Sequence, residues 1–147
     1  MTHCWLRRVV VCSFVLVGCL LAGCGPKEIR GAKLRGRLVK DGQPVGPQRG
    51  EQMLAVTFER VEPEGTQVIR SGGHVQKDGT FAIEGQMGKG TPPGKYMVWI
   101  HAEVVGDGES RFAHLFAGGK SPFLAEVTDQ EDQLFVVDVG KKTVTKQ

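Results

Sequence analysis

Residue types that could carry out chemistry are few after residue 24, and their spacing does not suit catalysis or metal binding. The three histidines of this region, His74, His101 and His114, do not stand in a His-x-x-x-His arrangement that would place two imidazoles on one metal ion. None of its serines lies in a Gly-x-Ser-x-Gly elbow, and no cysteine beyond position 24 could act as a nucleophile. The sequence therefore predicts no catalytic residue, no metal site and no cofactor.

The four cysteines all lie within the first 24 residues, at positions 4, 12, 19 and 24. This segment has a short basic start, Arg7 and Arg8, and then an apolar stretch from Val9 to Leu21 that ends in small residues. The stretch is too short for a transmembrane helix, which needs about 20 residues. The pattern is typical of an export signal, so residues 1–23 are expected to be removed.

Residues 21–24, Leu-Ala-Gly-Cys, resemble the lipobox of bacterial lipoproteins. The resemblance implies cleavage between Gly23 and Cys24, a diacylglyceryl group on the Cys24 thiol, and a fatty acid such as palmitate on the new amino terminus. It also implies a protein that is lipid-anchored to a membrane of the cell envelope. The outer membrane is favoured, because Gly25 rather than Asp follows the cysteine.

Two other interpretations of this segment stay open. Residues 16–19, Leu-Val-Gly-Cys, match the same pattern less well, because cleavage there would leave Leu20 and Leu21 in the tether. The segment could also be an ordinary secretory signal with an incidental cysteine at position 24.

The chain that would remain after cleavage has 124 residues, with 17 basic against 16 acidic side chains. This length suits one domain. The near-zero charge argues against a nucleic-acid partner, which a basic domain would favour. An exported chain with one cysteine also forms no internal disulfide, so its core alone must hold it together.

A polar tether is expected over residues 24–33, the domain over 34–140 and a polar tail over 141–147. The tether spans at most about 30 Å when extended. Basic residues cluster in and after it, namely Lys27, Arg30, Lys33, Arg35, Arg37 and Lys40. Each gains about 1 kcal/mol beside anionic headgroups. The alternative is that they form a solvated edge strand.

Several short segments alternate apolar and polar residues with period two, as strands with one buried face do. In the clearest of them the apolar face holds Tyr96, Val98, Ile100, Ala102 and Val104, and the other face holds Lys95, Met97, Trp99, His101 and Glu103. Turn signals separate these segments, at Asp41-Gly42, Asp78-Gly79 and Pro93-Gly94. The sequence therefore predicts an all-β fold, an antiparallel β-sandwich.

One stretch, residues 105–132, is too long for a simple hairpin loop. Ser110 precedes an apolar stripe of Phe112, Leu115 and Phe116, and Gly118-Gly119 follows it. We expect one capped helical turn here, lying over the sandwich.

The turn and strand motifs recur in a definite order: Leu34-x-Gly36-x-Leu38 with Asp41-Gly42, Leu54-x-Val56-x-Phe58, Asp78-Gly79-x-Phe81, Pro93-Gly94-Lys95-Tyr96 and Ser121-Pro122. In this order they resemble small bacterial lipoproteins with a carboxypeptidase regulatory-like, or transthyretin-like, domain. The resemblance covers most of residues 34–139. It implies a seven-stranded prealbumin-like sandwich, related in architecture to the immunoglobulin sandwich, with no catalytic residues of its own.

The residue that stands out from the alternation is Trp99, which shares the outward face with Met97 and His101. Either the segment 105–132 packs over it, through Phe112, Leu115 or Phe116, or it forms a patch for sugar rings or a protein partner.

These observations predict a membrane-anchored, non-enzymatic lipoprotein of the cell envelope, acting as a structural or protein-interaction module that contacts another envelope protein. The alternative is a carbohydrate or small-ligand binding module that uses the face of Trp99, Met97 and His101.

Overall fold

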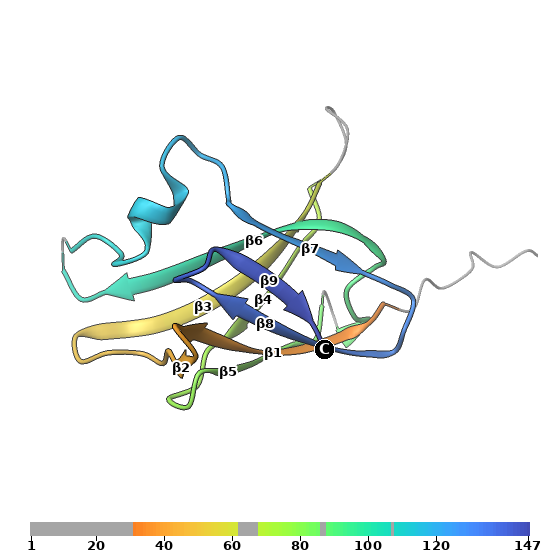
Figure 1. Ribbon diagram of the computed structural model, residues 1–147, viewed down its shortest axis with the longest axis horizontal. Coiled ribbons are helices and arrows are strands. Elements are labelled where there is room, and N and C mark those ends of the chain that lie inside the picture. Colours follow the sequence, from red (N-terminus) through yellow and green to blue (C-terminus); the bar gives the residue numbers. More distant parts are fainter. Residues whose placement is uncertain (1–30, 62–67, 86–87, 107) are drawn as a thin grey trace, which may run out of the picture.

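The computed structural model describes residues 31–61, 68–85, 88–106 and 108–147. These residues form two β-sheets packed face to face, with one short helical turn at one end (Figure 1). The all-β sandwich predicted from the alternating pattern is therefore confirmed. Among the described residues, no helix is long and apolar enough to cross a membrane.

The first sheet runs in the order β2-β1-β8-β9, and β5 pairs with β1 on the same side as β2. Its strands are β1 (Lys33–Lys40), β2 (Gln43–Pro44), β5 (Thr80–Ile83), β8 (Asp132–Asp138) and β9 (Thr143–Lys146). The second sheet runs in the order β4-β3-β6-β7. Its strands are β3 (Glu51–Arg60), β4 (Arg70–His74), β6 (Gly94–Val104) and β7 (Phe123–Val127).

Aromatic side chains from both sheets meet in the core. Phe58 of β3 lies with its ring centroid 5.5 Å from that of Phe135 on β8 and 6.2 Å from that of Tyr96 on β6. The Tyr96 hydroxyl donates to the Pro92 carbonyl at 2.7 Å, so the buried phenol is satisfied. Gly36 of β1 lies beneath the Phe81 ring, which occupies the space that a Cβ would need. The predicted inward face of β6 is buried from Tyr96 to Ala102.

Two predicted Asp-Gly turns are present. Asp41 and Gly42 join β1 to β2 with φ of 51° and 79°, the positive values that a tight two-residue hairpin turn requires. In the second turn, Gly79 has φ of 79° and the Asp78 carboxylate accepts hydrogen bonds from the Thr80 hydroxyl at 2.6 Å and the Thr80 N–H at 3.0 Å.

Hydrogen bonds from Thr80 hold the pKa of the exposed Asp78 carboxyl below its usual value. The hydroxyl has the largest effect and the Thr80 N–H the next largest, and the charge of Arg37 adds a smaller one. Thr80→Val keeps the side-chain shape but removes the hydroxyl, so it should raise the pKa of Asp78, measured by NMR titration of the carboxyl carbon. Arg37→Gln should raise this pKa less. Equal pKa values in the wild type and Thr80→Val would contradict this assignment.

The same shift sets the sign of a pH effect on stability. Because folding lowers the pKa of Asp78, its contribution is present above the unfolded-state pKa and is lost as the pH falls through the folded-state value. Acid unfolding of Thr80→Val should therefore show a smaller loss of stability over that interval than the wild type.

The sheets differ from the expected pattern in strand number and direction. The described residues contain nine strands rather than seven. The pairing of β1 with β8 is parallel, from Lys33 opposite Asp132 to Val39 opposite Asp138, so the expected purely antiparallel arrangement is wrong at this pair. Period-two alternation shows which face is buried but not the direction of the neighbouring strand, and the long chain between β1 and β8 permits the parallel return.

The fold also extends past both expected boundaries. Ala32, expected in the tether, is buried and exchanges backbone hydrogen bonds with Thr91 at 2.8 and 2.7 Å. Residues 143–146, expected in the polar tail, form β9 against β8, and the Gln147 N–H donates to the Leu134 carbonyl at 2.9 Å. Lys146 Nζ on β9 donates to Thr128 Oγ1, just after β7, at 2.8 Å. The C-terminal segment therefore belongs to the sandwich.

Candidate functional site

Gly23 and Cys24, the predicted cleavage and lipidation residues, lie outside the described residues. The described chain begins at Gly31, whose N–H donates to the Lys89 carbonyl at 2.8 Å. In Figure 1 this start of β1 and the C-terminus lie at the same end of the sandwich.

Trp99, Met97 and His101 share the outer face of β6, as the alternation predicted. His101 is exposed, and Met97 and Trp99 are partly buried. The ring of Phe116 lies against Trp99, with the centroids 5.1 Å apart and the planes inclined by 34°. Trp99 Nε1 is buried and has no hydrogen-bond partner in the part of the chain that the structure describes. Segment 105–132 therefore covers Trp99 in part, through Phe116.

The reason that this segment reaches Trp99 lies in the short strand β7. It pairs with β6 only as far as Val98. Beyond Val98, the edge of β6 that faces β7 can therefore bind another segment of the chain. Ser110 occupies it, and its Oγ accepts from the N–H groups of Ala102 at 3.1 Å and Phe112 at 3.3 Å. Further along, the Ser121 hydroxyl donates to the Val98 carbonyl.

The expected helical turn is a short 3-10 helix, η2 (Ala113–Phe116). Ser110 does not cap it directly, because its hydroxyl oxygen bonds the Phe112 N–H one residue before the helix. Phe112 and Leu115 are buried in the core, and the partly buried Phe116 contacts both the core residue Phe123, with ring centroids 6.2 Å apart, and Trp99. The whole apolar stripe therefore packs against the core, and Phe116 at its end also reaches Trp99 on the outer face of the sheet.

An ion pair between residues far apart in the sequence fixes this segment. Arg111 donates from Nε to Glu51 Oε1 at 2.7 Å and from Nη2 to Glu51 Oε2 at 3.2 Å. Nη2 also donates to the Gly46 carbonyl at 2.8 Å, and the guanidinium lies 4.5 Å over the Phe112 ring. The Glu51 side chain is only 7% exposed, so this is a largely buried two-point pair. No local spacing signals it, because the partners are 60 residues apart.

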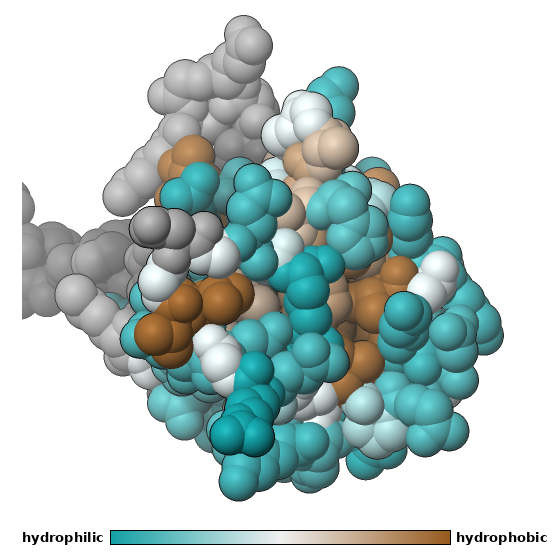
Figure 2. All heavy atoms as spheres, turned by 90° about the vertical axis from the view of Figure 1, so that its left-hand side faces the viewer, coloured by the Kyte–Doolittle hydropathy of each residue, from teal (hydrophilic) through white to brown (hydrophobic). Residues whose placement is uncertain are grey.

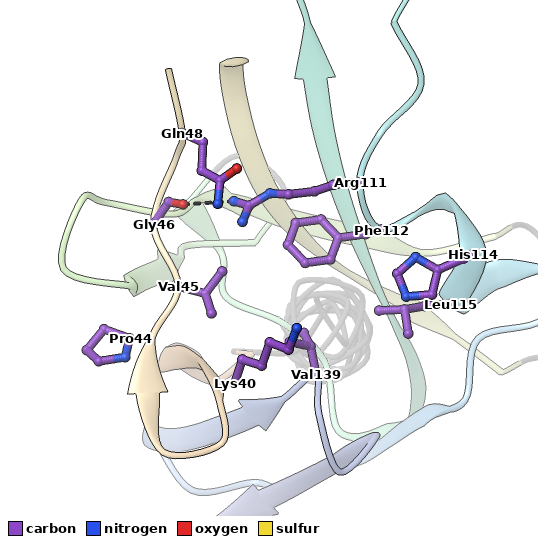
Figure 3. Close-up of a pocket in the computed structure, with 10 residues that line it drawn as sticks. All are labelled: Lys40, Pro44, Val45, Gly46, Gln48, Arg111, Phe112, His114, Leu115 and Val139. Carbon is purple, nitrogen blue, oxygen red and sulfur yellow. Dashed lines mark hydrogen bonds between the residues drawn. The ribbon is translucent and has the colours of Figure 1, made fainter. Parts of the chain in front are cut away.

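Beside this ion pair lies a pocket of about 400 Å³ (Figure 3). Its apolar lining comes from Pro44, Val45, Phe112, Leu115 and Val139. Its other lining residues are Lys40, Gly46, Gln48, Arg111 and His114. Figure 3 shows Lys40 and Val45 on one side and Phe112, His114 and Leu115 on the other, with Arg111 extending toward Gly46 and Gln48.

The polar groups of the pocket are dominated by hydrogen-bond donors. Lys40 and Arg111 are cationic, and none of the ten lining residues is acidic. Such an arrangement, with apolar and polar side chains both in the lining, suits noncovalent binding of a ligand that has both kinds of group. Figure 2 looks onto this end of the sandwich and shows apolar surface interrupted by hydrophilic residues.

His74 on β4 and His101 on β6 are both paired with Ala55 of β3, so they lie in one row across the second sheet, whereas His114 lies on η2; all three are exposed. Within the described ranges, no group of three or more histidine, cysteine or acidic residues is placed to hold a metal ion.

Comparison of the chain with protein-family models, with curated proteins and with solved structures found no match. The arrangement of its own residues therefore carries the functional argument.

Proposed function

We propose that this protein is a lipid-anchored, non-enzymatic module of the bacterial cell envelope that acts by contacting another envelope protein. The observation that carries the proposal is the Leu-Ala-Gly-Cys sequence at residues 21–24, after a short apolar stretch. The order of turn motifs supports it, through the resemblance to lipoproteins with a carboxypeptidase regulatory-like domain. The two packed sheets agree with the sandwich that this resemblance implies. Membership of the chain in that family is part of the proposal.

The position of the fold relative to Cys24 supports the anchoring. From Cys24 to Gly31 an extended chain spans about 23 Å, so the domain would stay near the bilayer. Strand β1 then runs from Lys33, beside the tether, to Lys40, which lines the pocket, a length of about 23 Å. An anchored domain would therefore hold the end with η2 and the pocket away from its point of attachment (Figure 1).

The environments of Ser110 and Ser121 support a non-enzymatic role. The Ser110 hydroxyl oxygen accepts two backbone N–H groups, and the Ser121 hydroxyl donates to a backbone carbonyl. These contacts hold the segment between β6 and β7, so both hydroxyls have structural tasks. The cover of Phe116 over Trp99 favours the protein-interaction role over a sugar platform at that face.

Cys24→Ala should abolish lipidation. In a bacterium that processes lipoproteins, the wild type should incorporate labelled palmitate and fractionate with membranes, and its intact mass should correspond to a chain that begins at Cys24 and carries acyl groups. The variant should incorporate no label, because it lacks the thiol that receives the lipid.

Cys19→Ala is the matched control, since it removes the weaker candidate and leaves residues 21–24 unchanged. It should be labelled like the wild type. Labelling of Cys24→Ala, or an unmodified mature protein that begins at another residue, would refute the anchoring proposal.

A further inference from the structure

We propose that the pocket between β2 and η2 binds small organic acids, with the carboxylate held at Lys40 and Arg111 and an apolar body lying against Pro44 and Val45 on one side and the exposed edges of Phe112 and Leu115 on the other. This inference goes beyond the proposed function and does not depend on lipidation, because every residue involved lies in the folded domain.

Two donors at the pocket, the Lys40 ammonium and Arg111 Nη1, are not used by the fold, whereas the other Arg111 donors named above are paired with Glu51 and Gly46. The Arg111 side chain is directed by Glu51 and Gly46 through Nε and Nη2, and Nη1 has no hydrogen-bond partner among the described residues. The exposed Lys40 ammonium likewise makes no hydrogen bond or ion pair with any residue that the structure describes. Charge-assisted hydrogen bonds from such groups to a carboxylate are about twice as strong as neutral ones.

The neighbouring acids are occupied by other partners or lie outside the lining. Both Glu51 oxygens accept from Arg111, and Oε2 also accepts the Gln48 N–H at 2.8 Å. Asp138 Oδ1 accepts the N–H groups of Gly140 and Lys141 at 3.0 and 3.1 Å. Asp41, beside Lys40, is exposed and does not line the pocket. An incoming carboxylate would thus meet donors in the pocket, whereas an ammonium group would meet no free acceptor of opposite charge there.

The apolar residues of the pocket determine which apolar body the ligand can carry beside its carboxylate. Pro44 belongs to β2, and Val45 follows it directly in the chain. Phe112 and Leu115 come from the segment that Arg111 anchors. The volume of about 400 Å³ suits a body the size of an aromatic ring with a short chain. The ion pair of Arg111 with Glu51 positions both the anion donor and the apolar wall, so the two parts of the site form together (Figure 3).

The test uses four probes: 3-phenylpropionate, 3-phenylpropan-1-ol and 3-phenylpropylammonium, which share one apolar body, and acetate, which has the carboxylate without that body. Each is titrated into the mature chain in a neutral detergent, and the backbone amide shifts of Val45, Phe112, Leu115 and Val139 are followed by NMR. The acid should bind saturably, the alcohol and acetate each about tenfold more weakly, and the ammonium ion not at all.

Lys40→Gln should weaken binding of 3-phenylpropionate about fivefold while leaving that of the alcohol unchanged, because only the anion uses the ammonium group. Lys120→Gln, an exposed change outside the pocket lining, should alter neither affinity. In the absence of a ligand, wild-type chemical shifts for the backbone amides of the two sheets would show that Lys40→Gln is folded. The proposal is overturned if the acid causes no saturable shift, if the alcohol binds as tightly as the acid, or if Lys40→Gln retains wild-type affinity for the acid.

Discussion

Val98→Asp should leave the sandwich unfolded at room temperature. Val98 is fully buried at the centre of β6, opposite Phe58 of β3 and Phe123 of β7. An unpaired carboxylate there costs several kcal/mol, a large part of the about 5–15 kcal/mol that stabilises a typical domain. Urea unfolding followed by circular dichroism should show no folded baseline for the variant. Ile100→Asp, two residues along the same face, should behave alike.

Lys95→Asp is the matched control, because it places the same carboxylate on the same strand at an exposed position. Its new charge lies opposite Glu126 of β7, so a loss of at most about 1 kcal/mol is expected. If Lys95→Asp unfolded the domain and Val98→Asp did not, the inward and outward faces of β6 would be reversed, since a shift of one residue exchanges them.

The features of the fold that could be predicted from the sequence are those encoded locally. Alternation along residues 95–104 predicted which side chains of β6 are buried, and Asp41-Gly42 predicted a hairpin turn whose geometry needs positive φ. Strand β7 has the same signal, with Phe123, Ala125 and Val127 buried, but it lies within residues 105–132, for which the pattern predicts a helical turn and no strand. Strand β9 has one partly buried apolar residue, Val144, which is too weak a pattern to identify a strand.

The candidate site could not be predicted because it depends on contacts between distant segments. Lys40 at the end of β1, Arg111 after β6 and His114 on η2 follow no shared motif, and only the packed sandwich brings them to one pocket. Trp99 was different, since its place on the outward face followed from alternation. The choice between a cover and an open patch needed the position of Phe116, which is set by the way β7 ends at Val98.

Trp99→Ala should lower the free energy of unfolding by about 3 kcal/mol, as truncation of a large packed aromatic does. The loss has two sources, the area buried under Phe116 and the contact of the two rings. Trp99→Ala and Phe116→Ala should therefore be non-additive by about 1 kcal/mol in a double-mutant cycle of urea unfolding. His101→Ala, at an exposed position on the same face, should change stability by no more than about 0.5 kcal/mol.

Fluorescence separates the cover from an open platform at the same residue. Of the two tryptophans, Trp5 lies in the segment expected to be removed, so emission from the mature chain would report Trp99 alone. Phe116→Ala should move this emission to longer wavelength, because it exposes the indole to water. If instead Trp99→Ala leaves the melting temperature unchanged but abolishes binding of a glycan, Trp99 is a ligand platform and the carbohydrate-binding alternative replaces the interaction module. If Phe116 covers the indole, we expect the opposite result: Trp99→Ala lowers the stability, and neither the wild type nor Trp99→Ala binds a glycan.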